Sequence, residues 1–161
     1  GVDMRVMRPG GAFCDPGEIG EIVIRGHNVM KGYYNKPKAT PEAIVDGWFH
    51  TGDLAYLDDE GNFRIVDRKK DLILRGGMNI YPRELEEVFY GHPKVLEAAV
   101  VGVPHDSLGE VVKVYLAPRA GESIHPHEIM DYAKPRMAEY KWPAEIEILT
   151  GKILKRELRK R

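Results

Sequence analysis

The chain has 161 residues, of which 43% are hydrophobic and 30% are charged, a composition that fits one ordinary globular domain or two small ones. Its 24 basic and 25 acidic residues leave a formal net charge of -1, which argues against a dedicated nucleic-acid-binding protein. No apolar run reaches the roughly 18 residues that a transmembrane helix needs. The single cysteine, Cys14, excludes an intramolecular disulfide and indicates a reducing compartment. We therefore expect a soluble, cytoplasmic protein without a transmembrane segment.

The first part of the chain is expected to form β-strands separated by glycine-rich loops. Residues 58–62 (Asp-Asp-Glu-Gly-Asn) are typical of a hairpin turn, because Asp and Asn tolerate turn geometry and Gly61 can adopt a positive φ. The stretch 26–53 contains repeated Gly and Pro and predicts an irregular loop with a short helix over 41–45, for which Thr40 is the N-cap. The strands are predicted over 18–25, 54–57 and 63–66.

A dense charge cluster over 67–71 separates the run of predicted strands from a mixture of strands and helices, and we place a domain boundary near Arg68. The best-defined helix follows over 81–89, because this segment starts with Tyr-Pro and carries apolar residues at i, i+3 and i+4. A second helical pattern covers 126–137, and Pro135 is expected to kink or end it. The remaining elements are strands over 98–103, 111–117 and 145–149 and a basic helix over 153–158. The sequence thus predicts an α+β protein.

Asp53 is the first candidate for a functional site. It ends the tripeptide Thr-Gly-Asp in a loop punctuated by glycines, ahead of a predicted strand. An ionised carboxylate only accepts hydrogen bonds, so it suits two neighbouring hydroxyls such as those of a ribose. The tripeptide alone is more typical of an Asx turn or a helix cap.

Gly76 and Gly77 are the second candidate, between a strand predicted over 72–74 and the helix over 81–89. Paired glycines allow a ligand to approach the backbone closely, and a helix N-terminus can host an anion. A plain strand-to-helix turn is the commoner explanation. The spacing excludes a Walker phosphate loop.

Lys152 is the third candidate, because it follows a glycine just ahead of a predicted basic helix and can reach a phosphate as a point charge. A solvated basic tail is the commoner alternative, and a nucleic-acid or membrane-surface patch over 152–161 is another. The six histidines show no metal-ligand spacing, so the sequence predicts no protein-bound metal.

Four motifs follow one another along the chain: Gly47-Trp-Phe-His-Thr-Gly-Asp53, Asp67-Arg-Lys-Lys-Asp71, Gly76-Gly-Met-Asn-Ile-Tyr-Pro-Arg-Glu-Leu-Glu86 and Thr150-Gly-Lys-Ile-Leu154. In this order they resemble the acyl-adenylate-forming superfamily, which comprises acyl-CoA synthetases, peptide-synthetase adenylation domains and luciferases. Within it the chain looks most like a long- or medium-chain fatty-acid CoA ligase. The resemblance implies that residues 1–67 are strands from the β-barrel tail of a large N-terminal AMP-binding domain, and that 68–161 form a small mobile C-terminal α+β domain.

The resemblance also implies two consecutive reactions. A carboxylate, here that of a fatty acid, attacks the α-phosphorus of Mg-ATP and gives acyl-AMP and pyrophosphate. The thiol of CoA then displaces AMP and gives the thioester. The implied ligands are therefore ATP with its Mg²⁺, AMP, a fatty acid and CoA as co-substrate, and the implied partner is the large N-terminal domain.

The resemblance further implies a role for each of several residues. Asp53 corresponds to the carboxylate that holds both ribose hydroxyls, and Arg68 to the arginine that also contacts the ribose. Lys70 corresponds to the hinge about which the small domain rotates between the two half-reactions. Gly76 and Gly77 correspond to the loop that lines the pantetheine tunnel, where absent side chains make room.

Lys152 resembles the mobile lysine that stabilises the charge developing on the acyl carboxylate and the α-phosphate. The segment 147–152 lacks the short proline-containing loop that the family pattern expects before Gly-Lys, which affects the placement of this lysine.

The family's phosphate loop, its Tyr-Gly-x-Thr-Glu segment and its acid pocket do not occur in the sequence. We therefore expect the chain to be the C-terminal fragment of an acyl-CoA synthetase and to be inactive by itself. The alternatives are a non-catalytic module that binds a nucleotide, CoA or a protein partner, and another acyl-adenylate branch that uses an aryl or short-chain acid or a carrier-protein acceptor.

Overall fold

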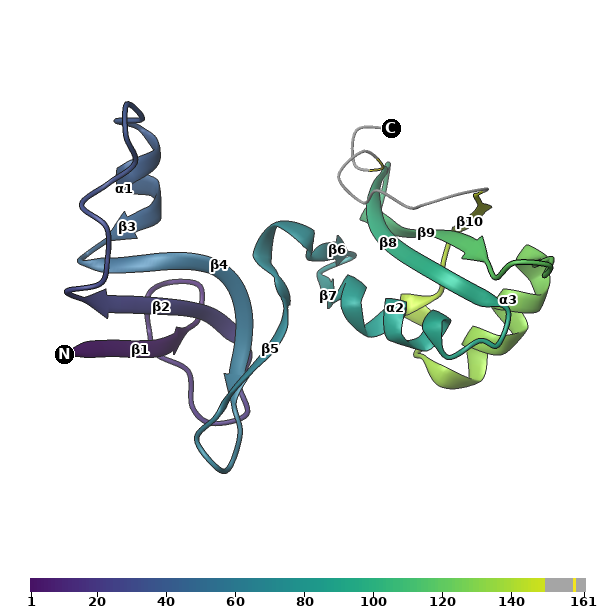
Figure 1. The fold of residues 1–161 in the computed structure, drawn as a ribbon, viewed down its shortest axis with the longest axis horizontal. Coiled ribbons are helices and arrows are strands. Elements are labelled where there is room, and N and C mark those ends of the chain that lie inside the picture. The colour runs from purple at the N-terminus through teal and green to yellow at the C-terminus, as the bar shows by residue number, and fades with distance from the viewer. Residues whose placement is uncertain (150–157, 159–161) are drawn as a thin grey trace. The chain divides into compact units, whose positions relative to one another are not determined.

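The computed structural model describes residues 1–149 and Leu158, and it divides the chain into two compact units, Gly1–Lys70 and Asp71–Arg161 (Figure 1). The division falls within a single 3-10 turn, Lys69–Asp71. Mostly antiparallel sheets with few helices make up both units, which confirms the α+β class. None of the helices in the described residues is long and apolar enough to cross a membrane.

The first unit is an antiparallel sheet of five strands, in the order β1-β2-β4-β3 with β5 also paired to β4. Met7, Val23 and Trp48 form its buried apolar cluster. The strands are β1 (Val2–Met7), β2 (Gly20–Gly26), β3 (Ile44–Val45), β4 (Trp48–Leu57) and β5 (Phe63–Arg68). The predicted strands and the hairpin around 58–62 are present, and Asp58 accepts the backbone N–H groups of Glu60 and Asn62 in that turn.

The expectation of an irregular loop from 26 to 53 is partly wrong, because β4 begins at Trp48. Asp46 and Gly47 both adopt positive φ, 50° and 80°, and turn the chain so that the short β3 pairs with the start of β4. An Asp-Gly pair with this geometry is the standard two-residue hairpin turn. Strand β1 was also not predicted from the sequence.

The short helix is displaced from its predicted place. Helix α1 spans Ala39–Ala43 and its N-cap is Lys38, so Thr40 lies inside the helix and is not its cap. The Thr40 hydroxyl instead accepts the backbone N–H of Tyr33 at 3.0 Å. The helix ends early because Ile44 and Val45 join the sheet.

The second unit contains β6 (Ile73–Arg75), β7 (Met78–Ile80), α2 (Pro82–Tyr90), β8 (Val95–His105), β9 (Gly109–Pro118), α3 (Pro126–Ala133) and β10 (Glu145–Ile148). Its sheet has the order β10-β9-β6-β7, with β8 also paired to β9, and β10 alone among the described strands pairs in parallel. Helices α2 and α3 cover one face of this sheet (Figure 1).

Apolar residues bury both faces of strands β8 and β9. Alternate residues of β9, such as Val112 and Val114, pack with Leu85 and Phe89 of α2. On the other face Tyr115 belongs to a second buried cluster. The other buried members of this second cluster are Ala99, Val101 and Leu158. Burial on both faces explains why β8 reads as a continuous apolar run.

Helices α2 and α3 are both present as predicted, but α3 is shorter than the predicted helix. Helix α2 begins at Pro82, as expected. Helix α3 stops at Ala133 and continues as a 3-10 turn, Lys134–Arg136, because Pro135 has no N–H to donate to the preceding turn. The helix predicted over 153–158 lies outside the described residues except for Leu158.

Candidate functional site

A β-bulge in β4 carries the first candidate residue. Glu21 of β2 pairs with Leu54 and Val23 pairs with His50, so the three residues Thr51 to Asp53 face a single residue, Ile22. Gly52 adopts a φ of +77°, which favours glycine. Bulges of this kind bend a strand and redirect side chains, and they are frequent beside functional sites.

The hydroxyl of Thr51 fixes the bulge by two hydrogen bonds. It donates to the carbonyl oxygen of Ile22 at 2.9 Å and accepts the backbone N–H of Asp53 at 3.1 Å. Asp53 therefore lies in a strand and not at a helix N-terminus. The sequence motif contains Thr51 but indicates no role for it, and the structure shows that its hydroxyl holds the bulge in place.

Asp53 and Arg68 lie directly opposite each other on β4 and β5. Their side chains form an ion pair, with 3.1 Å between Asp53 Oδ1 and Arg68 Nε. The Asp53 side chain is 29% exposed and that of Arg68 is 61% exposed, so a ligand can reach both. Beside them is a cavity of about 380 Å³ lined by Thr51, Gly52, Arg68, Lys69 and Lys70.

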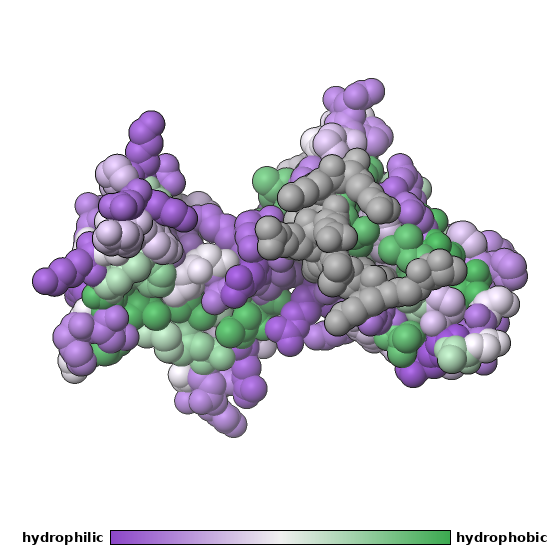
Figure 2. All heavy atoms as spheres, turned by 45° about the horizontal axis from the view of Figure 1, so that its top comes forward, coloured by the Kyte–Doolittle hydropathy of each residue, from purple (hydrophilic) through white to green (hydrophobic). Residues whose placement is uncertain are grey.

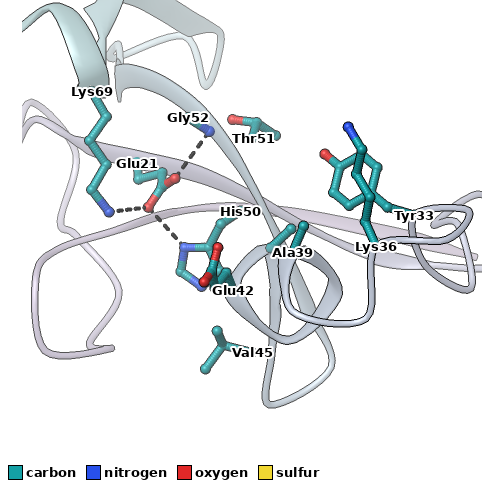
Figure 3. A pocket seen from close by; sticks show the side chains of 11 residues that line it. Glu21, Tyr33, Lys36, Ala39, Glu42, Val45, His50, Thr51, Gly52 and Lys69 are labelled. Carbon is teal, nitrogen blue, oxygen red and sulfur yellow. Dashed lines mark hydrogen bonds and ion pairs between the residues drawn. The ribbon is translucent and has the colours of Figure 1, made fainter.

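Glu21 forms a buried polar centre behind this bulge, and sequence reasoning missed it (Figure 3). The residue is 7% exposed. Its Oε1 accepts the backbone N–H of Gly52 at 3.0 Å, and its Oε2 contacts His50 Nδ1 at 2.8 Å and Lys69 Nζ at 3.0 Å. The signal in the sequence was a charged residue at the start of an otherwise apolar strand, Gly-Glu-Ile-Val-Ile.

The charge state of Glu21 follows from these contacts. Burial raises the pKa of this carboxyl, but the hydrogen bonds from His50 and Lys69 outweigh burial and hold its pKa below the ordinary value of 4.5. Glu21 is therefore ionised near neutral pH. Because an ionised carboxylate cannot donate, His50 carries its proton on Nδ1 in this hydrogen bond.

A wider open cavity of about 700 Å³ lies on the same side of the first unit (Figure 3). It shares Glu21, His50, Gly52 and Lys69 with the polar centre. Lysine and histidine side chains around a buried carboxylate give this face donors as well as acceptors, which suits a polar ligand.

Lys70 lies in the 3-10 turn Lys69–Asp71, at the last position of the first unit. It also lines the smaller cavity together with Arg68. The predicted hinge residue therefore lies two positions after the predicted ribose contact, where the two compact units are joined by a single stretch of backbone.

Gly76 and Gly77 form the two-residue turn of a β-hairpin, so the expected strand-to-helix turn is wrong. Strand β7 separates them from helix α2, and Arg75 pairs with Met78 across the turn. Both glycines have positive φ, 55° and 81°. A side chain at Gly77 would meet no atom of the described residues within 4 Å, so the backbone at this turn is open to a ligand.

The turn is anchored at Gly76. The backbone N–H of Gly76 donates to the carbonyl oxygen of Leu108 at 2.8 Å, which ties the turn to the loop before β9.

Lys152 lies outside the described residues. Among the described residues no group of three or more His, Cys, Asp or Glu side chains is arranged to hold a metal ion.

The fold and the ordered motifs are similar to those of the C-terminal part of adenylate-forming enzymes. The AMP-binding enzyme C-terminal domain family matches residues 84–158, within the second unit. The whole chain is similar to the C-terminal part of proteins of the acyl-adenylate-forming superfamily.

The chain is 47% identical over 166 residues to a feruloyl-CoA synthase of Amycolatopsis sp, across 99% of this chain and 34% of that protein. It is 45% identical over 155 residues to a long-chain-fatty-acid–CoA ligase of Bacillus subtilis (strain 168), across 92% of this chain and 28% of that protein. A solved structure of o-succinylbenzoate coenzyme A synthetase from Bacillus subtilis, in complex with ATP and magnesium ion, has a TM-score of 0.81 at 42% identity, across 92% and 30% of the two chains. The chain thus spans about a third of the length of the curated relatives it matches.

Proposed function

We propose that this chain is the C-terminal part of an ATP-dependent acyl-CoA synthetase. The complete enzyme would join a carboxylic acid to AMP, with cleavage of the bond between the α-phosphorus and the bridging oxygen and release of pyrophosphate. The sulfur of CoA would then attack the acyl carbon, lose its proton and release AMP. Magnesium would arrive bound to ATP.

The Asp53–Arg68 pair carries this proposal. Two side chains on adjacent strands, one an acceptor and one a donor, form an ion pair and are both partly exposed, and Arg68 lines a cavity. Asp53 can accept hydrogen bonds from two neighbouring ribose hydroxyls, and Arg68 can donate to a ribose oxygen while it holds the carboxylate. The relative that binds ATP with magnesium has a closely similar fold.

We assign the hinge to Lys70 and the approach of the CoA arm to Gly76 and Gly77. The division of the chain at Lys70 supports the first role. The open space beside Gly77 supports the second, because a thiol-bearing arm must pass close to the backbone. Lys152 is proposed to stabilise the charge that develops during adenylation.

The first unit is proposed to be the end of a larger N-terminal AMP-binding domain. Apolar side chains are exposed on this unit (Figure 2). They include Val2, Met4, Phe13, Ile19 and Ile65, each at least 38% exposed. Exposed apolar residues in this number are typical of a surface that another part of the protein covers.

A long- or medium-chain fatty acid is the proposed substrate, supported by 45% identity to the Bacillus subtilis long-chain-fatty-acid–CoA ligase. An aryl acid is the second candidate, because the similarity to the Amycolatopsis feruloyl-CoA synthase is 47%. An assay of thioester formation by the complete protein with fatty acids and with ferulic acid distinguishes the two.

Asp53→Asn in the complete protein tests the nucleotide site. The amide keeps the shape but loses the charge and one acceptor, so we expect the KM for ATP to rise about tenfold or more, since a hydrogen bond to a charged group contributes roughly 1.5–3 kcal/mol. Asp59→Asn is the matched control, because this exposed aspartate lies in the β4–β5 turn. An unchanged KM for ATP in Asp53→Asn would contradict the assignment.

A further inference from the structure

Glu21 carries a buried charge. Neither packing in the apolar core nor contact with the proposed ligands explains why a charged side chain lies there. A buried carboxylate is costly unless several donors satisfy it, and three donors do so here: the backbone N–H of Gly52, His50 Nδ1 and Lys69 Nζ. Figure 3 shows these three groups converging on the one carboxylate from different segments.

Two of these donors lie next to the proposed nucleotide contacts. Gly52 directly precedes Asp53 in β4, and Lys69 directly follows Arg68 at the end of β5. Regular strand pairing between β2 and β4 is interrupted here by the bulge. The carboxylate of Glu21 therefore ties β2 to the bulged part of β4, where the β2–β4 ladder is interrupted, and also to Lys69 just after β5.

We propose that Glu21 is a positioning residue for the nucleotide site: it holds the backbone at Gly52 and the side chain of Lys69, and thereby fixes Asp53 and Arg68 in the orientation that binds the two ribose hydroxyls. This inference rests on the proposed function. Glu21 itself does not contact the substrate in this arrangement.

Replacement by glutamine separates this role from the shape of the side chain. In Glu21→Gln the remaining oxygen can still accept the N–H of Gly52, but the amide nitrogen is a donor and meets the donors of His50 and Lys69. The link to Lys69 is lost. A small displacement of a ligand-holding group has large effects on rate, up to roughly a hundredfold for about 1 Å.

The test uses steady-state kinetics of the complete protein. We expect Glu21→Gln to raise the KM for ATP roughly tenfold, with the KM for the carboxylic acid unchanged. Glu18→Gln is the matched control, because this glutamate also forms an ion pair in the first unit, with Arg8 at 2.7 Å, but does not contact the bulge. A KM for ATP that is unchanged in Glu21→Gln overturns the proposal.

Lys69 gives a second, milder variant in case Glu21→Gln does not fold. Its side chain is 60% exposed, so Lys69→Met should fold, and we expect it to raise the KM for ATP in the same direction by a smaller factor. Lys69→Arg keeps the donor and should restore the wild-type KM. Equal values for Lys69→Met and the wild type overturn the proposal.

Failure of the inference is distinguishable from failure of the proposed function. If Asp53→Asn raises the KM for ATP and neither Glu21→Gln nor Lys69→Met does, only the positioning role is wrong. If the complete wild-type protein shows no ATP-dependent acyl transfer, the proposed function is wrong and the positioning role falls with it.

Discussion

At the scale of single residues, the proposed nucleotide site depends on groups that fix a carboxylate without covering it. Asp53 has its backbone N–H bonded to the Thr51 hydroxyl and its side chain paired with Arg68. Preorganised acceptors bind a ligand better than free ones, because less conformational entropy is lost on binding. The exposed Asp53–Arg68 pair itself is expected to add little to folding stability.

Glu21 is the residue whose charge depends most directly on the folded state. Its pKa is lowered in the folded protein by the hydrogen bonds from His50 and Lys69, despite the opposing effect of burial. In the unfolded chain these partners are absent. The folded protein therefore binds fewer protons at this carboxyl than the unfolded chain does, between the lowered pKa and the ordinary value of 4.5.

The sign of the resulting pH dependence is definite. The stabilisation from Glu21 is present above pH 4.5 and is lost as the pH falls through the lowered pKa. We expect the free energy of unfolding of the first unit to fall as the pH decreases through this range, and to fall less in Glu21→Gln than in the wild type. Urea unfolding followed by Trp48 fluorescence in a Trp142→Phe background measures it, with Glu60→Gln as the control. Identical acid losses in wild type and Glu21→Gln would contradict the expectation.

At the scale of elements, glycines with positive φ shape a candidate site in each unit separately. Gly52 allows the bulge that turns Asp53 toward Arg68, and Gly76 with Gly77 closes the β6–β7 hairpin. Two consecutive positive φ values are those that a type I′ turn requires, and a residue with a Cβ is strained there.

Gly77→Val isolates this backbone requirement, because within the part of the chain that the structure describes a side chain at Gly77 meets no atom within 4 Å. We expect the second unit to lose about 1–2 kcal/mol of unfolding free energy, the usual cost of a left-handed conformation. Gly77→Asn should lose less, since Asn tolerates this conformation. Urea unfolding followed by Trp142 fluorescence, in a Trp48→Phe background, tests the difference. Equal losses for Val and Asn would show that backbone conformation is not the cause.

At the scale of the whole molecule, each unit has its own apolar cluster. In the second unit, residues 84–158 match the C-terminal domain of AMP-binding enzymes, and Leu149 and Leu158 both pack on the same cluster of β8 and β9.

The chain by itself is expected to be inactive. It spans about a third of the length of its curated relatives, and the sequence contains no phosphate loop. We expect no ATP–pyrophosphate exchange by the 161-residue chain with any fatty acid or with ferulic acid, and we expect exchange by the complete protein. Exchange above the blank by the isolated chain would refute this expectation.

Much of the second unit was predictable from local signals. Helix α2 and the strands β8, β9 and β10 were all expected, because a proline at a helix start and long apolar runs are local and unambiguous. The hairpin at Asp46 and Gly47 was missed although Asp-Gly is a strong turn signal. Strand β1 was missed although apolar and charged residues alternate along its first five positions, and β7 was missed because three residues are too few to show a period.

The sequence by itself determined the superfamily and the candidate residues, because four short motifs in a fixed order are specific even where each one is weak. The tertiary structure alone decided that Asp53 faces Arg68 across two strands, that Gly76 and Gly77 form a hairpin, and that Glu21 is buried among three donors. The physical reason is that strand register and burial arise from contacts between segments distant in sequence, which no local pattern specifies.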